Sequence, residues 1–245
     1  FDCGSGVTQR LNAAGVKSSD IEILFVTHLH SDHVMDIYQL YISGWHQGRD
    51  KKFRIVGPRG TKEFFQNILK AFKNELQGRV EWEQRPNKDG LDYEITEIDS
   101  DYAYKNFDLE IIPFEVDHYP VEPAYGYQIK VLDTVKEKKV VISGDTRKNE
   151  NLINYAMDAD ALVHEVFINL EFDEKRMSKK TISNVRDYHT SPKEIGEIAK
   201  AANVKKLILT HFVPPIFDEA FLTKEIGESY KGNVIIGEDL LTIEI

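Results

Sequence analysis

The chain has 245 residues, of which 41% are hydrophobic and 29% are charged, and its formal net charge at pH 7 is −10. This length supports one large α/β domain or two small ones, and the acidic balance argues against binding a long nucleic acid through an extended basic surface. No apolar run approaches the roughly 18 residues of a membrane-spanning helix, so no membrane partner is expected. The single cysteine, Cys3, excludes an internal disulfide and a cysteine-rich zinc site.

The first half of the chain predicts strands that alternate with helices. Apolar runs indicate strands at 21–27 and 53–56, and helical spacing of apolar residues indicates helices at 34–45 and 61–76. Residues 77–106 are polar, and only the alternation over 93–98 suggests a further strand.

The second half continues the alternation but adds a hairpin. Strands are expected at 107–116, 125–132, 139–143, 161–164, 206–210, 233–236 and 240–245, and helices at 149–157, 192–203 and 217–230. The pair at 125–132 and 139–143 predicts a hairpin. Residues 170–188 predict a basic loop, and Ser191-Pro192-Lys193-Glu194 predicts a capped helix start. No Pro/Gly/Ser-rich linker or internal repeat occurs, so a single domain over 1–245 is expected.

Four metal-binding side chains stand together directly after the strand predicted at 21–27. They are His28, His30, Asp32 and His33, and three of the eight histidines of the chain are among them. Imidazoles and a carboxylate at the end of a strand are the donors that a divalent cation such as zinc accepts. This cluster therefore predicts a metal site.

Three later strands also end at a residue that could bind a metal. His118 follows the strand at 107–116, Asp145 follows the strand at 139–143, and His211 follows the strand at 206–210. Each is weak evidence alone, since a single histidine at a strand end is often structural and Asp145 could instead cap the next helix. Together with the first cluster they supply seven ligands, which is what two cations with open positions for water require.

This arrangement resembles the metallo-β-lactamase superfamily, and more narrowly its branch with tRNase Z and the zinc-dependent arylsulfatases. Supporting motifs are Phe1-Asp2-Cys3-Gly4, Ser143-Gly144-Asp145-Thr146, His164-Glu165, His189-Thr190-Ser191-Pro192 and Thr210-His211-Phe212. The resemblance implies an αββα sandwich, in which two mixed β-sheets are flanked by helices, and a metal-dependent hydrolase that acts on ester bonds.

The resemblance also implies how the ligands divide between two divalent metal ions. His28, His30 and His118 would hold one ion, Asp32, His33 and His211 the other, and Asp145 would bridge them. Zinc fits a set of His and Asp ligands best, although iron and manganese also accept it. Asp32 would in addition orient the attacking water or accept its proton.

Glu165 and His189 match the paired motifs of this branch, and the resemblance makes them a proton donor for the leaving oxygen. Such a pair requires a protonated imidazole, which an adjacent carboxylate favours. The alternatives are a buried salt bridge for Glu165 and, for His189, a residue that orients a metal ligand.

The expected substrate is a small anionic sulfate or phosphate ester, as for an arylsulfatase-like or phosphodiesterase-like enzyme. In tRNase Z relatives an arm between the segments equivalent to His118 and Asp145 grips tRNA. Here those two residues are only 27 positions apart (145 − 118), and a hairpin takes nearly all of that length, so tRNA is not an expected partner. The alternatives are an RNase Z-type tRNA 3′-processing endonuclease and a metal-binding protein without turnover.

Two further expectations come from the resemblance. In the family, Phe-Asp-Cys-Gly follows the first strands of one sheet, so we expect the natural chain to be longer at its N-terminus. The compartment is then cytoplasmic by default, with a periplasmic or secreted protein as the alternative if a leader has been removed. Dimers are common in the resembling families, so a homodimer is compatible with the resemblance.

Overall fold

The computed structural model describes residues 1–99, 102–132, 137–168 and 177–245. It divides into two compact units, unit 1 from Phe1 to Ser100 and unit 2 from Asp101 to Ile245. Each unit has its own buried apolar cluster, formed in unit 1 around Trp45, Phe53 and Phe65 and in unit 2 around Leu162 and Leu209. The expectation of a single domain over 1–245 stays a prediction.

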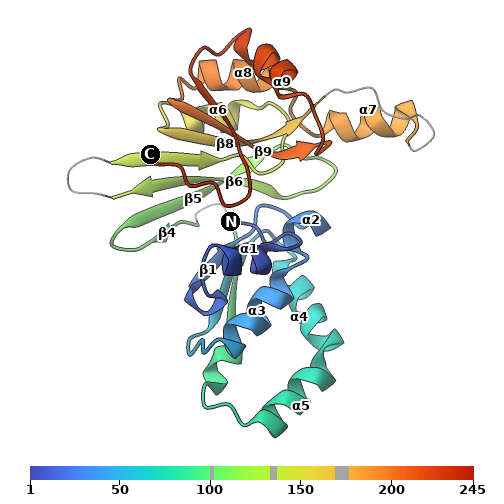
Figure 1. The fold of residues 1–245 in the computed structure, drawn as a ribbon, viewed down its shortest axis with the longest axis vertical. Coiled ribbons are helices and arrows are strands. Elements are labelled where there is room, and N and C mark those ends of the chain that lie inside the picture. The colour runs from blue at the N-terminus through green and yellow to red at the C-terminus, as the bar shows by residue number, and fades with distance from the viewer. Residues whose placement is uncertain (100–101, 133–136, 169–176) are drawn as a thin grey trace. The chain divides into compact units, whose positions relative to one another are not determined.

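Unit 1 contains a three-stranded sheet in the order β1-β2-β3, and both pairings are parallel. Parallel neighbours require crossover connections, and helices fill those connections here (Figure 1). The strands are β1 (Ile23–Phe25), β2 (Phe53–Gly57) and β3 (Tyr93–Glu97); the helices are α1 (Val7–Ala13), η1 (Ser18–Asp20), α2 (Ser31–Val34), α3 (Ile37–His46), α4 (Thr61–Ala71), α5 (Lys73–Glu83) and η2 (Lys88–Leu91).

The helix predicted at 61–76 is in fact two helices, because α4 ends before Phe72 and α5 begins after it. Most of α5 lies in the stretch predicted to be irregular. No residue of α5 is fully buried, so its sequence lacks the apolar stripe that reveals a helix. Ion pairs four residues apart support it instead, with Arg79 contacting Glu75 and lying 3.0 Å from Glu83.

Unit 2 contains a seven-stranded sheet in the order β10-β9-β8-β7-β6-β5-β4. Neighbours from β4 to β7 are antiparallel, and neighbours from β7 to β10 are parallel. The strands are β4 (Tyr104–Lys105), β5 (Leu109–Val116), β6 (Ala124–Val131), β7 (Lys138–Ile142), β8 (Ala161–Phe167), β9 (Lys206–Val213) and β10 (Asn233–Ile236). The predicted hairpin is therefore the pair β6 and β7.

The strand directions determine where the ligand-bearing loops of unit 2 lie. Since β5 and β7 are both antiparallel to β6, they run in the same direction, and β8 and β9 are parallel to β7. The carboxyl ends of these four strands consequently lie at one edge of the sheet. His118 and Asp145 follow β5 and β7 at this edge, and His211 lies near the end of β9.

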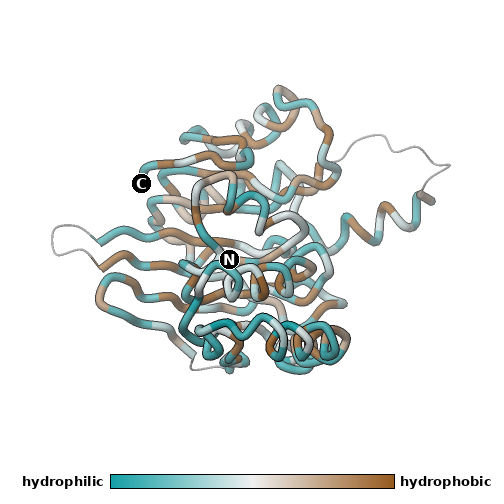
Figure 2. The backbone as a smooth tube through the Cα atoms, turned by 60° about the horizontal axis from the view of Figure 1, so that its bottom comes forward, coloured by the Kyte–Doolittle hydropathy of each residue, from teal (hydrophilic) through white to brown (hydrophobic). Residues whose placement is uncertain are grey.

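Unit 2 has four described helices, α6 (Glu150–Ala156), α7 (Lys179–Asp187), α8 (Pro192–Ala201) and α9 (Glu219–Gly227). Helices α6, α8 and α9 lie over the sheet, whereas α7 extends away from it (Figure 1). Hydrophobic and hydrophilic residues alternate along much of the chain (Figure 2), as expected for elements that bury one face. The capping box predicted at Ser191 is present, with reciprocal hydrogen bonds between Ser191 and Glu194.

Two predictions at the end of the chain were wrong. Part of the basic loop expected at 170–188 is the helix α7, which begins at Ser178, whose hydroxyl accepts a hydrogen bond from the Thr181 amide at 3.1 Å; residues 169–176 lie outside the described residues. The strand expected at 240–245 does not form, and the side chains there are mostly exposed. In the described parts of the chain, no helix is long and apolar enough to cross a membrane.

Candidate metal centre

The histidine cluster of unit 1 occupies the loop after β1 and the short helix α2. His28 is fully buried, and His33 is 6% exposed. The Nε2 atom of His28 lies 3.1 Å from Nδ1 of His30, and the rings of His28 and His33 have centroids 4.0 Å apart. Asp32 lies beside His33, with its Oδ2 atom 3.7 Å from Nε2 of His33. The four predicted residues of this cluster are therefore close together within unit 1.

Asp2 orients this cluster, a role that the motif Phe1-Asp2-Cys3-Gly4 did not predict. Its Oδ2 atom accepts hydrogen bonds from His33 Nδ1 at 2.8 Å and from the Thr27 hydroxyl at 2.9 Å, and its Oδ1 atom accepts one from the Thr27 amide at 2.8 Å. A carboxylate on one ring nitrogen fixes the tautomer and leaves the other nitrogen to bind a metal. Asp2 therefore directs His33 Nε2 toward the side where a metal would bind.

The rest of the N-terminal segment packs against the same loop. The Cys3 amide donates a hydrogen bond to the His33 carbonyl at 2.7 Å. A Cβ atom at Gly4 would lie only 2.0 Å from the Asp32 carbonyl oxygen, so only glycine allows this approach. The motif Asp2-Cys3-Gly4 thus supports the cluster from behind.

The donors of unit 2 stand at the edge where its parallel strands end. His118 is 1% exposed and Asp145 is 2% exposed. His118 donates through Nδ1 to the Tyr188 carbonyl at 2.9 Å, and in this tautomer Nε2 is the nitrogen that would bind a metal. His211 Nε2 lies 3.5 Å from Asp145 Oδ2, and His189 Nδ1 lies 3.9 Å from the same oxygen.

His211 owes its position to an irregularity in β9. Pairing between β8 and β9 shifts register, so that His164 faces Leu209 but Val166 faces Phe212, which leaves one additional residue on β9. His211 in this stretch has a φ of 46°, a conformation that non-glycine residues rarely adopt. Such bulges redirect side chains and are frequent beside active sites. The sequence predicted the strand to end at Thr210, whereas it continues to Val213.

Glu165 and His189 form the pair that the sequence motifs predicted. His189 Nδ1 lies 3.2 Å from Glu165 Oε1, and this oxygen also accepts hydrogen bonds from the amides of Thr190 at 3.0 Å and Thr146 at 3.3 Å. Both side chains are buried. Burial raises the pKa of the Glu165 carboxyl above its ordinary value, and the neighbouring His189 opposes this rise. The pair therefore favours holding a proton between its two groups.

His164, the other residue of the His164-Glu165 motif, is buried in the sheet and has a structural role. It is fully buried in β8, its Nδ1 donates to the Glu165 carbonyl at 2.6 Å, and desolvation lowers its pKa to about 4. The ring is therefore neutral at physiological pH.

The donor set fits divalent metal ions. Two nitrogens bound to one tetrahedral zinc at ~2.0–2.1 Å would lie roughly 3.3 Å apart, close to the 3.1 Å between His28 Nε2 and His30 Nδ1. Within unit 2, the Asp145 carboxylate lies 3.5 Å from His211 Nε2, close enough for both to bind one ion. Buried imidazoles directed at each other and at a carboxylate, with no sulfur donor among them, suit zinc and similar cations.

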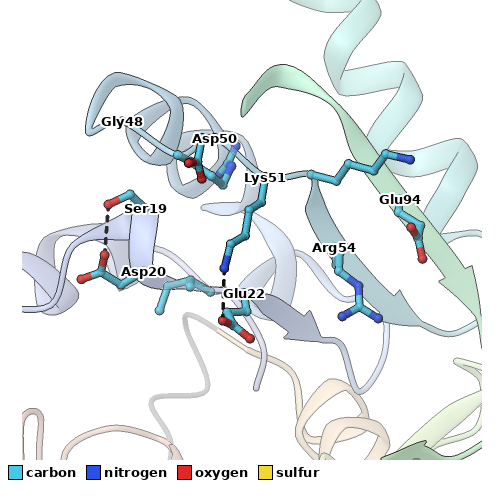
Figure 3. A pocket seen from close by; sticks show the side chains of 11 residues that line it. Ser19, Asp20, Glu22, Gly48, Asp50, Lys51, Arg54 and Glu94 are labelled. Atoms are coloured by element: carbon cyan, nitrogen blue, oxygen red, sulfur yellow. Dashed lines mark hydrogen bonds and ion pairs between the residues drawn. The ribbon is translucent and has the colours of Figure 1, made fainter. Parts of the chain in front are cut away.

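A cavity of about 580 Å³ elsewhere in unit 1 is not lined by such a set of metal-binding side chains (Figure 3). It lies beside Glu22, directly before β1, and Lys51, shortly before β2, at the amino ends of these strands, whereas ligands of parallel sheets bind at the carboxyl ends. Acidic and basic side chains mix around it, and Lys51 lies 3.6 Å from Glu22. It is therefore not the candidate site.

Two sheets flanked by helices, with His and Asp donors at strand ends, define a hydrolase of the metallo-β-lactamase fold. The metallo-β-lactamase fold protein YhfI from Bacillus subtilis matches 97% of this chain and 83% of its own, with a TM-score of 0.71 and 22% identity. Human tRNase Z, short form, matches 100% of this chain and 87% of its own, with a TM-score of 0.67 and 22% identity.

Comparison of amino-acid sequences identifies the family of this chain within the metallo-β-lactamase superfamily. The family model for the Anti-Pycsar protein Apyc1 matches residues 1–212. Ribonuclease Z of Mycobacterium sp. (strain KMS) is 31% identical over 249 residues, which cover 100% of this chain and 85% of the relative. The chain belongs to the family of the Anti-Pycsar protein Apyc1, within the tRNase Z branch of the metallo-β-lactamase superfamily.

These findings confirm the predicted superfamily, the fold class and a metal-dependent hydrolase that acts on ester bonds. They give no support to arylsulfatase-like activity. The similarity to ribonuclease Z also shows that the expectation of a small anionic ester substrate, with tRNA as an unexpected partner, was wrong. The physical reason is that net charge averages over the whole chain and does not report the charge beside the site.

Proposed function

We propose that this chain is an RNase Z-type endonuclease that hydrolyses a phosphodiester bond at the 3′ side of a tRNA precursor. The observation that carries this proposal is the similarity to ribonuclease Z over the entire chain. The buried pair of Glu165 and His189 supports it, because an RNA alkoxide is a poor leaving group that needs a proton donor.

We further propose that seven residues bind two divalent ions, with zinc as the best fit. One ion would be held by His28, His30 and His118, the other by Asp32, His33 and His211, with Asp145 shared. When bound, such ions activate water as a nucleophile and neutralise charge on a phosphate. The support is the close approach of the donors within each unit.

The side chains then have distinct tasks. The Asp32 carboxylate, which is 63% exposed, orients the attacking water and accepts its proton. His189 donates a proton to the leaving oxygen, and Glu165 favours the protonated imidazole from 3.2 Å away. Asp2 and the Tyr188 carbonyl hold His33 and His118 in orientation through their Nδ1 atoms.

The hairpin of β6 and β7 limits which part of a tRNA the protein can contact. These strands occupy 124–131 and 138–142 of the segment between His118 and Asp145, so the segment has no room for an arm that would reach the tRNA elbow. We therefore propose that recognition is confined to the acceptor end. A minihelix with a 3′ trailer should be cleaved with a kcat/KM within about threefold of that for the full tRNA precursor.

The test is cleavage of a tRNA precursor by the metal-loaded protein, with and without a chelator, and metal analysis of the same sample. Asp145→Ala should lose metal and activity together, whereas His46→Ala, a histidine outside the proposed site, should retain both. Two bound metals per chain without any cleavage would leave a metal-binding protein without turnover and would overturn the proposal.

A further inference from the structure

We propose that a cavity beside His189 binds the RNA phosphate next to the scissile one, on the side of the leaving oxygen. This inference rests on the proposed function and adds a substrate subsite to it. The cavity, of about 750 Å³, lies wholly within unit 2. We call it the His189 cavity; its cationic lining residues are Arg147, Lys148, Arg186 and Lys193.

Three elements of unit 2 enclose the His189 cavity. Arg147 and Lys148 come from the loop after β7, Arg186 comes from the end of α7, and Lys193 comes from the first turn of α8. His189 lies in the short connection between α7 and α8. A substrate oxygen that approaches His189 from this cavity would therefore lie next to these cations.

The acidic residues around the cavity already have partners. Asp187 accepts a hydrogen bond from Arg147 at 2.9 Å, and Glu197 accepts one from Lys148 at 2.6 Å. Glu194 accepts from the Ser191 amide at 3.0 Å in the capping box of α8. Each of these three carboxylates therefore already has a hydrogen-bond partner, and Glu197 is in addition close enough to Lys193 for a favourable electrostatic interaction.

Arg186 and Lys193 are the two cationic lining residues that do not take part in these hydrogen bonds. Both side chains are exposed, and neither makes an ion pair within 4 Å among the described residues. The first turn of α8, a ten-residue helix, adds the positive end of its dipole beside Lys193. In a chain whose net charge is −10, two exposed cations beside the proton donor form a local site for an anion, and in RNA that anion is the neighbouring phosphate.

The experiment compares two double variants with the same change in charge. Arg186→Ala/Lys193→Ala removes the two cavity cations. Lys180→Ala/Lys200→Ala removes exposed cations from the same two helices outside the cavity. Each is assayed on a trailer-containing RNA and on bis(p-nitrophenyl) phosphate, whose leaving group carries no second phosphate.

The cavity variant should raise KM for the RNA roughly tenfold and change kcat little, and hydrolysis of bis(p-nitrophenyl) phosphate should stay at the wild-type level. The slope of log KM against log salt should fall by about 0.7, since one phosphate contact on a single strand contributes about that amount. The control variant should change neither the slope nor KM by more than about twofold.

Equal KM values for RNA in the two double variants would overturn the subsite, as would an equal loss on both substrates. Fluorescence anisotropy with an uncleavable 2′-O-methyl RNA gives a second measurement that does not depend on turnover. A wild-type protein that cleaves no RNA refutes the proposed function. The subsite is still decided in that case, because weaker RNA binding by the cavity variant alone supports it and equal binding refutes it.

Discussion

Replacing Glu165 should separate the structural contribution of this carboxylate from its chemical one. The Oε1 atom of Glu165 accepts the amides of Thr146 and Thr190 and faces His189, so it ties the segments after β7 and before α8 to β8. Glu165→Ala leaves two buried N–H groups without an acceptor, at a cost of roughly 1–3 kcal/mol each. Removing a buried carboxyl group offsets part of this cost, and we expect a net loss of about 3 kcal/mol.

Glu165→Gln keeps an oxygen of similar reach, so its stability should fall by only about 1 kcal/mol. Both variants lack the negative charge that favours a protonated imidazole, and kcat for RNA should fall by about 100-fold in each. Glutamine should thus restore stability without restoring turnover.

The stability assay is urea unfolding of the chelated protein, which removes any contribution from bound metal. Far-UV circular dichroism is the appropriate signal, since Trp45 and Trp82 are the two tryptophans of the chain and both lie in unit 1. Glu228→Ala, an exposed glutamate of unit 2, serves as the control, with an expected change below about 0.5 kcal/mol. A loss below about 1 kcal/mol for Glu165→Ala would refute the reasoning, and so would full activity of Glu165→Gln.

Three further predictions concern His189, Cys3 and Ser191. His189→Ala should leave metal content unchanged and lower kcat by about 100- to 10,000-fold for RNA, but far less for bis(p-nitrophenyl) phosphate, whose leaving group needs no proton; equal losses would exclude the proton-donor role. Burial raises the pKa of the Cys3 thiol to about 12, so iodoacetamide at pH 8.5 should modify only the unfolded chain, as mass spectrometry would show. The folded-state pKa of Cys3 lies above the unfolded value, so the folded protein favours the neutral thiol. The contribution of Cys3 to the free energy of unfolding is therefore fully present below pH ~9 and is lost as the pH rises toward 12. Ser191→Ala removes the capping box of α8 and should cost about 1 kcal/mol in urea unfolding, whereas an unchanged midpoint would show that the box contributes nothing.

The residues proposed to bind metal could be selected from the sequence because their signal is local. A strand followed by His28, His30, Asp32 and His33 is readable from adjacent positions, and the same holds for an apolar run that ends near His118. The role of Asp2 was not predictable in this way, because its contact with His33 spans 31 positions. The conformation of His211 depends on a register shift against β8, which the sequence of β9 alone does not contain.

The elements that were missed lacked the feature on which prediction depends. Helices α5 and α7 have no fully buried residue. The apolar residues Leu76 and Val80 in α5 and Ile182 and Val185 in α7 are only partly buried, and they are too few to make the wide apolar stripe of a packed helix. The substrate expectation failed for a related reason. A net charge of −10 describes the whole chain, whereas Arg186 and Lys193 become neighbours only when α7 and α8 bring them to one cavity.

The hairpin of β6 and β7 offers a practical consequence. Because β6 runs opposite to β5 and β7, its last residue, Val131, and the first residue of β7, Lys138, lie at the far margin of the sheet from His118 and Asp145. A fluorophore or a surface tether attached at Lys138 would thus leave the chemistry of the opposite margin undisturbed. Immobilised or labelled protein for single-molecule work could be prepared through this position.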